Sequence, residues 1–337
     1  MIIKMIKQRI LSGMRPTGKL HLGHLVGALE NWVKLQSEYE CFYMIADWHA
    51  LMSEYADSSH LGEDTRKMVI DWLACGIDPK RSVIFRQSDI PGHTELHLIF
   101  SCITPLGWLE RCPTYKEQLA EIKERDLTTY GFLGYPVLQA ADILIYKALV
   151  VPVGEEQLPH LELTREIARR FNYLFKRQVF PFPQAKLTST PRLLGLDRRK
   201  MSKSYGNTIN LSDPPEEIRK KVQTMFTDPK RIKRTDAGHP QECNVYDYYK
   251  IFHPTRAENL IPECKTAKLG CTDCKKELGE ILIKRLEPIQ LKRREIQAQK
   301  GYLEQVGEVL QEGVKKAGQI AAQTMREVKQ AIGIRDE

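Results

Sequence analysis

The sequence has no run of about 18 apolar residues, which is the length that a membrane-spanning helix requires. Residues 1–10 also contain no long apolar stretch and no small-residue cleavage site, so we expect no secretory leader. These absences predict a protein with no membrane partner and a cytoplasmic location. There, its eight cysteines would be thiols or metal ligands rather than disulfides.

Two common nucleotide-binding patterns are also missing from the sequence. Neither a Gly-rich P-loop nor a Gly-x-Gly-x-x-Gly turn occurs. There is no internal repeat and no low-complexity linker. Any nucleotide site in this chain must therefore use another pattern.

The overall composition is that of an ordinary globular protein. The chain has 337 residues, with 42% hydrophobic and 28% charged side chains, which is enough for one large or two medium domains. Its formal net charge of +8 is compatible with a polyanionic partner such as nucleic acid.

The first two-thirds of the chain alternate short apolar runs with helical patterns. We expect strands at residues 10–11, 41–46, 83–85 and 149–153, and a helix over residues 161–171. This alternation predicts an α/β fold with a Rossmann-like, doubly wound parallel sheet. Ligands of such sheets bind at the carboxyl ends of the strands.

Helical patterns dominate after Ser204. Residues 212–217 resemble a helix start, with a capping oxygen, prolines and then two acids. Apolar residues at three- and four-residue steps over 303–332 predict an amphipathic helix or two. We therefore expect a catalytic domain over residues 1–205 and a mainly helical domain over residues 206–337.

The first motif is a Gly/His-rich turn at residues 16–24. Its glycines permit close approach of a ligand, and the helix that starts near Gly23 offers backbone N–H groups to an anion. His21 and His24 are three residues apart, so both can face a phosphate. The alternative is a capped turn with solvent-exposed histidines.

The second motif is the run Lys200-Met201-Ser202-Lys203-Ser204. Two flexible lysines in one loop can stabilise the charge that develops on a leaving pyrophosphate. The alternative is a solvated basic loop without a ligand.

Together, His21-Leu22-Gly23-His24 and residues 200–204 resemble the two signature motifs of class I aminoacyl-tRNA synthetases. The segments 47–51, 135–144, 151–157 and 160–166 are similar to the tryptophanyl-tRNA synthetase family of the bacterial type. The resemblance covers residues 9 to 230, and it implies a tryptophan–tRNA ligase. Its partners would be ATP, L-tryptophan and tRNA(Trp), Mg²⁺ would accompany ATP, and the protein would be a homodimer.

The resemblance also implies a role for individual residues. Catalysis would depend on His21, His24, Lys200 and Lys203. The ATP site would consist of Arg15, Pro16, Thr17, Gly23, His24, Gly154, Glu155, Glu156, Leu193, Lys200, Met201, Ser202, Lys203 and Ser204. The tryptophan site would consist of His49, Tyr135, Gln139, Asp142, Val151, Val153 and Gln157.

Asp142 matches the family's acceptor for the indole N–H, which needs an acceptor when buried. The alternative for Asp142 is a helix cap. Gln139, where relatives often have Met, and Leu11, where they often have an aromatic residue, depart from the family. A tyrosyl-tRNA synthetase-like ligase is the second interpretation, because a carboxylate accepts from a phenol as well. A third is a non-aminoacylating RNA-binding paralogue.

Four late cysteines form the pattern C-x20-C-x6-C-x2-C: Cys243, Cys264, Cys271 and Cys274. Four thiolates suit Zn²⁺ or an iron–sulfur cluster, and the spacing alone also permits no metal. A similar pattern in some bacterial tryptophanyl-tRNA synthetases implies a 4Fe-4S cluster. The other four cysteines are expected to be buried thiols.

The region from residue 206 onward also carries many basic residues. They could contact tRNA phosphates, or they could be ordinary solvated helix faces. The candidates are Lys220, Lys221, Lys230, Arg231, Lys233, Arg234, Lys284, Arg285, Lys292, Arg293 and Arg294.

Overall fold

The computed structural model describes residues 7–113, 115–116, 119, 126–187 and 193–334. Within these residues, five parallel strands form one sheet in the order β3-β2-β1-β4-β5. The strands are β1 (Arg9–Met14), β2 (Glu40–Ile45), β3 (Ser82–Arg86), β4 (Val150–Val153) and β5 (Gln184–Leu187). The strand order reverses between β1 and β4, so the predicted doubly wound α/β class is confirmed.

The edge strand β5 was not predicted. Its sequence, Gln184-Ala185-Lys186-Leu187, has no apolar run, and all four residues remain at least partly exposed. An edge strand pairs on one side only and buries little side-chain surface, so its sequence carries only a weak strand signal.

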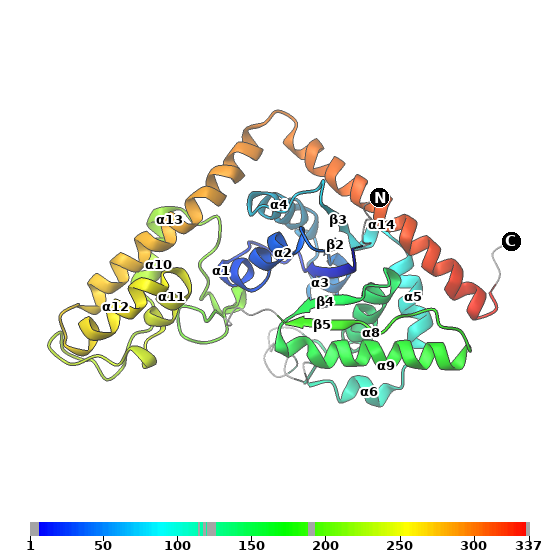
Figure 1. The fold of residues 1–337 in the computed structure, drawn as a ribbon, viewed down its shortest axis with the longest axis horizontal. Helices are drawn as coiled ribbons and strands as arrows, with labels where there is room; N and C mark the ends of the chain where they lie inside the picture. The colour runs from blue at the N-terminus through cyan, green and yellow to red at the C-terminus, as the bar shows by residue number, and fades with distance from the viewer. Residues whose placement is uncertain (1–6, 114, 117–118, 120–125, 188–192, 335–337) are drawn as a thin grey trace, which may run out of the picture.

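Helices cover both faces of the sheet (Figure 1). Alternate strand residues divide between two hydrophobic clusters, with Ile10 and Tyr43 on one face and Leu11 and Phe42 on the other. The first face packs against α1 (Leu22–His24), η1 (Leu25–Leu29), α2 (Glu30–Leu35) and α4 (Leu61–Ala74). The second packs against α5 (Gly92–Ser101), α8 (Tyr130–Ile145) and α9 (Leu158–Leu174). The shorter helices are α3 (Asp47–Glu54) and α6 (Leu106–Glu110).

The helices of the second half form two arms (Figure 1). One arm contains α10 (Pro215–Gln223), α11 (Asn244–Phe252), α12 (Pro254–Lys265) and α13 (Cys271–Ala298). The other is the single helix α14 (Tyr302–Ala331), and the turn between the arms contains Gly301 with φ of 75°. Helix α10 begins with the expected prolines and acids, but its N-cap is Pro214, and the Asp213 carboxylate pairs with Lys221 instead of capping the helix.

Helix α14 returns to the sheet and packs against β3 and α5. The approach is so close that a Cβ added at Gly313 would lie 1.8 Å from the carbonyl oxygen of Ile84. Helices α10 to α13 therefore form the outlying helical arm, whereas α14 covers an edge of the sheet. No helix in the described ranges is both long and apolar enough to cross a membrane.

Candidate active site

A cavity of about 470 Å³ opens where the carboxyl ends of β1 and β4 meet. Small-molecule sites typically have volumes of about 300–1,000 Å³ and lie at such switch points. The cavity walls bring together the following sequence-predicted residues: Arg15, Thr17, His24, His49, Tyr135, Gln139, Asp142, Val151, Val153, Gly154, Glu156 and Gln157. Residues from both predicted ligand sites therefore share one space.

Several other predicted residues are not among the described residues that line this cavity. Leu193 and Met201 are only 5% and 7% exposed and belong to a hydrophobic core. Pro16 and His21 are buried as well, whereas Glu155 and Lys200 are exposed. Gly23, Ser202 and Lys203 also lie outside the cavity walls, and Ser204 belongs to η4 (Lys203–Tyr205). The apolar side chains of Leu193 and Met201 therefore pack in the hydrophobic core and do not line the cavity.

The two sequence motifs are in direct contact. The ammonium group of Lys203 donates a hydrogen bond to the carbonyl oxygen of Thr17 at 2.7 Å. Gly18 follows with φ of 95°, a conformation that favours glycine, and Lys203 packs beside it. A Cβ added at Gly23 would lie 3.3 Å from the sulfur of Met201. Both motifs therefore belong to one site, although they are far apart in the sequence.

Asn207 holds the second motif in place, and the sequence analysis missed it. Its side chain is buried, accepts from the Ser202 N–H at 2.9 Å, and donates to the Lys200 carbonyl at 3.0 Å and to Asp197 at 2.7 Å. A single asparagine after a basic loop has no distinctive pattern. Its role comes entirely from the turn of the chain around it.

Burial lowers the pKa of both histidines of the first motif. Burial, together with the nearby Lys203 ammonium, lowers the pKa of His21 to about 4. His24 Nδ1 accepts from the His21 backbone N–H at 3.2 Å, so the neutral ring carries its proton on Nε2. The first helical N–H, that of Leu22, already donates to Ile209 O at 2.9 Å. The histidines are therefore neutral donors at pH 7, and part of the expected helix N-terminus is already bonded.

Lys203 is also affected by its surroundings. Burial lowers its pKa to about 8, and the nearby Arg15 adds to this effect, whereas the carboxylate of Asp64 opposes it. The ammonium group is therefore held in a place where its charge is only partly compensated. An approaching triphosphate would supply the missing negative charge.

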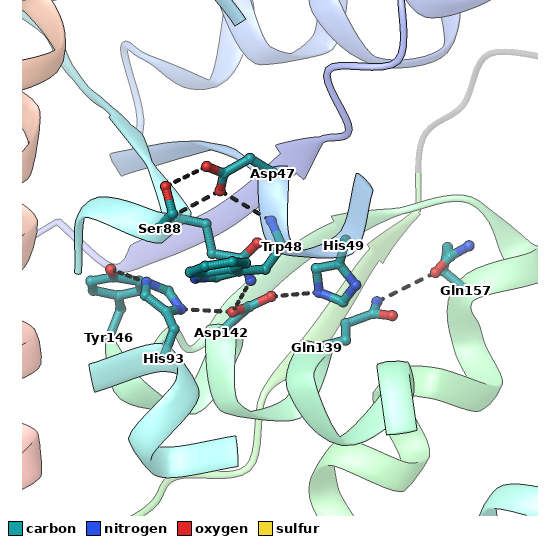
Figure 2. Close-up of polar contacts among 10 residues, drawn as sticks. Asp47, Trp48, His49, Ser88, His93, Gln139, Asp142, Tyr146 and Gln157 are labelled. Atoms are coloured by element: carbon teal, nitrogen blue, oxygen red, sulfur yellow. Dashed lines mark hydrogen bonds and ion pairs between the residues drawn. The ribbon is translucent and has the colours of Figure 1, made fainter. Parts of the chain in front are cut away.

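The carboxylate of Asp142 is the centre of a hydrogen-bond network (Figure 2). Oδ2 accepts from His49 Nε2 at 2.8 Å, and Oδ1 accepts from Gln87 Nε2 at 2.7 Å and from His93 Nδ1 at 2.6 Å. Burial alone would raise the pKa of Asp142, but the hydrogen bonds from His49 and His93 prevail and lower it. Asp142 is thus an ionised acceptor in the interior of α8, so the helix-cap alternative is wrong.

Three members of this network were not predicted. Gln87 begins η2 (Gln87–Asp89) directly after β3, His93 lies in the first turn of α5, and Tyr146 follows α8. The Tyr146 hydroxyl lies 2.7 Å from His93 Nε2. The one sequence signal for Gln87 was its place as a polar residue at the carboxyl end of a buried strand.

A second network crosses the other side of the cavity. The Tyr135 hydroxyl lies 2.8 Å from His160 Nε2, and His160 Nδ1 lies 3.0 Å from Gln157 Oε1. Gln139 Nε2 donates to the same oxygen at 3.4 Å. Because Gln157 Oε1 accepts, His160 Nδ1 donates, and Nε2 accepts from Tyr135. Burial lowers the pKa of His160 to about 4, so this network remains neutral at pH 7.

The four late cysteines line one small cavity of about 20 Å³, together with apolar residues from α11 and α12. This volume is close to that of a single water molecule. In the ranges that the structure describes, no three His, Cys, Asp or Glu side chains are arranged as the ligands of one metal ion. The four thiols nevertheless converge on this one cavity. Among the other cysteines, Cys41 and Cys112 are buried as expected, whereas Cys102 is exposed.

Some of the basic residues that were predicted to contact tRNA form ion pairs within the chain. Lys221 pairs with the buried Asp213 at 2.6 Å, and Arg293 of α13 pairs with the buried Asp71 of α4 at 2.7 Å. The second pair joins the helical arm to the sheet domain. These two cations stabilise the tertiary structure instead of facing solvent.

Comparisons with known proteins give a consistent result. A family model described as tRNA synthetases class I (W and Y) matches residues 6–287. The tryptophan–tRNA ligase of Thermotoga maritima is 55% identical over 329 residues, covering 97% of this chain and 99% of the relative. That of Aquifex aeolicus is 44% identical over 399 residues, covering 97% and 100%.

Solved structures show the same relationship. Tryptophanyl-tRNA synthetase from Campylobacter jejuni, complexed with ADP and tryptophan, matches with a TM-score of 0.83 and 31% identity over 96% of this chain and 99% of that one. A tyrosyl-tRNA synthetase from Archaeoglobus fulgidus matches with a TM-score of 0.67 and 24% identity over 85% and 90%. The second likeness concerns the fold alone.

Proposed function

The chain belongs to the tryptophanyl-tRNA synthetases of class I, and we propose that the cavity between β1 and β4 is where tryptophan and ATP react. It is an aminoacyl-tRNA ligase for tryptophan. The enzyme first forms tryptophanyl-adenylate and pyrophosphate, and then transfers tryptophan to the 3′ end of tRNA(Trp). One observation supports this site. The same cavity is lined by Asp142 and by Thr17, whose carbonyl oxygen accepts a hydrogen bond from Lys203.

Tryptophan would occupy the inner part of the cavity. The ionised Asp142 accepts the indole N–H, which would otherwise be buried without a partner at a cost of about 1–3 kcal/mol. His49, Tyr135, Val151 and Val153 line the indole plane. Gln139 holds the substrate ammonium group through its amide oxygen, and Gln157, whose Oε1 already accepts from Gln139 and His160, orients Gln139 in the tryptophan site.

ATP would occupy the outer part. Arg15, Thr17, Gly23, His24, Gly154, Glu155 and Glu156 contact the nucleotide, and Lys200, Ser202, Lys203 and Ser204 close over its phosphates. The buried Pro16 and the core residues Leu193 and Met201 support these contacts, and the backbone N–H of His21 donates to His24. Mg²⁺ bound to the triphosphate supplies further charge neutralisation.

Catalysis in this site depends on positioning and charge. A carboxylate oxygen of tryptophan attacks the α-phosphorus of ATP, the bond to the bridging oxygen breaks, and pyrophosphate leaves with the bonding electrons. No proton needs to move in this step. Lys200 and Lys203 stabilise the charge that develops on the leaving pyrophosphate.

Amino-acid-dependent ATP–pyrophosphate exchange tests this assignment directly. We expect exchange with tryptophan and none with tyrosine, and we expect Asp142→Asn to raise the KM for tryptophan at least tenfold by weakening the acceptor. Exchange that Asp142→Asn leaves unchanged would contradict the role of Asp142. Cys102→Ser, at an exposed position outside the cavity, is the matched control.

The helical domain, residues 206–337, would bind the anticodon arm of tRNA(Trp), supported by its many basic residues. As the resemblance implies, two copies would form a homodimer, and the enzyme would act in the cytoplasm together with its tRNA. Sedimentation of the protein with and without tRNA measures both assemblies. A purely monomeric protein would contradict the first.

Cys243, Cys264, Cys271 and Cys274 would hold a 4Fe-4S cluster that ties α11, α12 and α13 together, with Zn²⁺ as the alternative. The support is the resemblance and the convergence of four thiols on one cavity. Iron, sulfide and zinc analysis of anaerobically purified protein decides between the two. Cys271→Ser should lose the metal, whereas Cys102→Ser should retain it.

A further inference from the structure

We propose that Gln87, His93 and Tyr146 form a positioning group for tryptophan selection, here called the carboxylate support. The group orients Asp142 and determines which of its oxygens receives the indole N–H. This inference rests on the proposed role of Asp142 as the indole acceptor. None of the three residues is among the described residues that line the cavity, so they act through Asp142 alone.

The two carboxylate oxygens of Asp142 have different surroundings. Oδ1 accepts from both Gln87 and His93, whose side chains are completely buried behind the cavity. Among the residues that the structure describes, Oδ2 accepts from His49 alone, and His49 lines the cavity. A carboxylate oxygen has two lone-pair directions. Oδ1 is therefore saturated, and the open direction for an indole N–H is on Oδ2.

Tyr146 fixes the orientation of the donor on His93. The ionised carboxylate requires a proton on His93 Nδ1, and in the tautomer that leaves Nε2 as an acceptor, the Tyr146 hydroxyl donates to it at 2.7 Å. The Tyr146 hydroxyl is fully buried and keeps its proton, since burial raises its pKa. Without this hydroxyl, the opposite tautomer would place a lone pair against the Asp142 carboxylate.

The side chain of Gln87 has an unfavourable feature, a buried polar atom that does not stabilise the fold. Its Nε2 donates to Asp142, but its Oε1 is buried without a hydrogen-bond partner among the described residues. A buried oxygen without a hydrogen-bond donor destabilises the folded state. Unsatisfied polar atoms are rare in native cores and often occur at functional sites. We attribute the one on Gln87 to its function of orienting Asp142.

The scaffold around the carboxylate support is rigid. Asp47, at the start of α3, accepts from the Ser88 N–H at 3.0 Å and from the Ser88 hydroxyl (Figure 2). This contact ties the segment of Gln87 to the helix of His49. Helix α14 packs against β3 and α5, which lead to Gln87 and carry His93. The donors around Asp142 are therefore held from both sides.

The test compares tryptophan with an analogue whose indole N–H is replaced by sulfur, β-(3-benzothienyl)alanine. In ATP–pyrophosphate exchange, we expect Gln87→Met and Tyr146→Phe each to lower the preference for tryptophan about tenfold. The loss should come from a higher KM for tryptophan, with kcat and the KM for the analogue nearly unchanged. A general structural defect would instead affect both substrates equally.

Tyr43→Phe is the matched control, because Tyr43 is also fully buried and its hydroxyl donates to Trp32 O at 2.8 Å. It should lower the melting temperature without changing the preference for tryptophan. Gln87→Met should leave the melting temperature unchanged or raise it, since it also removes the unpaired oxygen. The carboxylate support is refuted if either test variant keeps the wild-type preference, or if Tyr43→Phe loses it equally.

Asp142→Asn separates this inference from the site on which it rests. If Asp142→Asn keeps the full preference for tryptophan over the analogue, Asp142 is not the indole acceptor, and the proposed site itself is wrong. If Asp142→Asn loses the preference while Gln87→Met and Tyr146→Phe retain it, the site stands and only the carboxylate support fails.

Discussion

The lowered pKa of Lys203 predicts a pH dependence that most lysines would not show. Its ammonium group has an ordinary pKa of 10.5, and burial brings this to about 8 in the nucleotide-free enzyme. Below pH 8 the group is charged and can pair with phosphate. As the pH rises through 8 the charge is lost, so the capture of ATP should become less efficient.

The expected magnitude follows from the charged fraction. At about pH 9, roughly one-tenth of Lys203 would remain charged, whereas a lysine with an ordinary pKa would be almost fully charged. The value of kcat/KM for ATP should therefore be constant below pH 8 and fall about tenfold per pH unit well above it, because it reports the free enzyme. In the ATP complex, the phosphates raise the pKa, so kcat should fall only at higher pH.

ATP–pyrophosphate exchange at saturating tryptophan, measured over this pH range, tests the reasoning. Lys203→Arg is the informative variant, because a guanidinium remains charged and should remove the break in kcat/KM near pH 8, whatever its absolute rate. A wild-type profile without this break would refute the assignment. A break of the same size in Lys203→Arg would mean that another group titrates.

Three further changes have expected outcomes. Lys203→Ala should lower kcat in pyrophosphate exchange far more than it changes the KM for tryptophan, because the ammonium acts on the leaving group; unchanged turnover would contradict that role. Asn207→Ala removes the buried contacts to the second motif and should raise the KM for ATP severalfold in the same assay, with the KM for tryptophan unchanged. Arg293→Met leaves Asp71 buried without its partner and should destabilise the protein by about 3–5 kcal/mol in denaturant unfolding, whereas Arg293→Met with Asp71→Asn should recover most of this loss.

Much of the catalytic half could be predicted because its signals are local. Strands such as β2 (Glu40–Ile45) bury both faces, and residues 41–45 of this strand are therefore continuously apolar. The helical segment after the first motif buries Leu25, Leu29, Trp32 and Leu35, which recur at three- and four-residue steps. The edge strand β5 lacked such a signal, because it buries little side-chain surface.

The sequence by itself determined the alternating strands and helices, the two motifs and the presence of a carboxylate at position 142. These properties depend on residue type and short-range periodicity. Only the tertiary structure decided that Lys203 lies against Thr17, that His21 is neutral, and that Gln87 and His93 saturate one oxygen of Asp142. Burial and hydrogen bonding determine charge and orientation, and both depend on neighbours that are distant in the sequence.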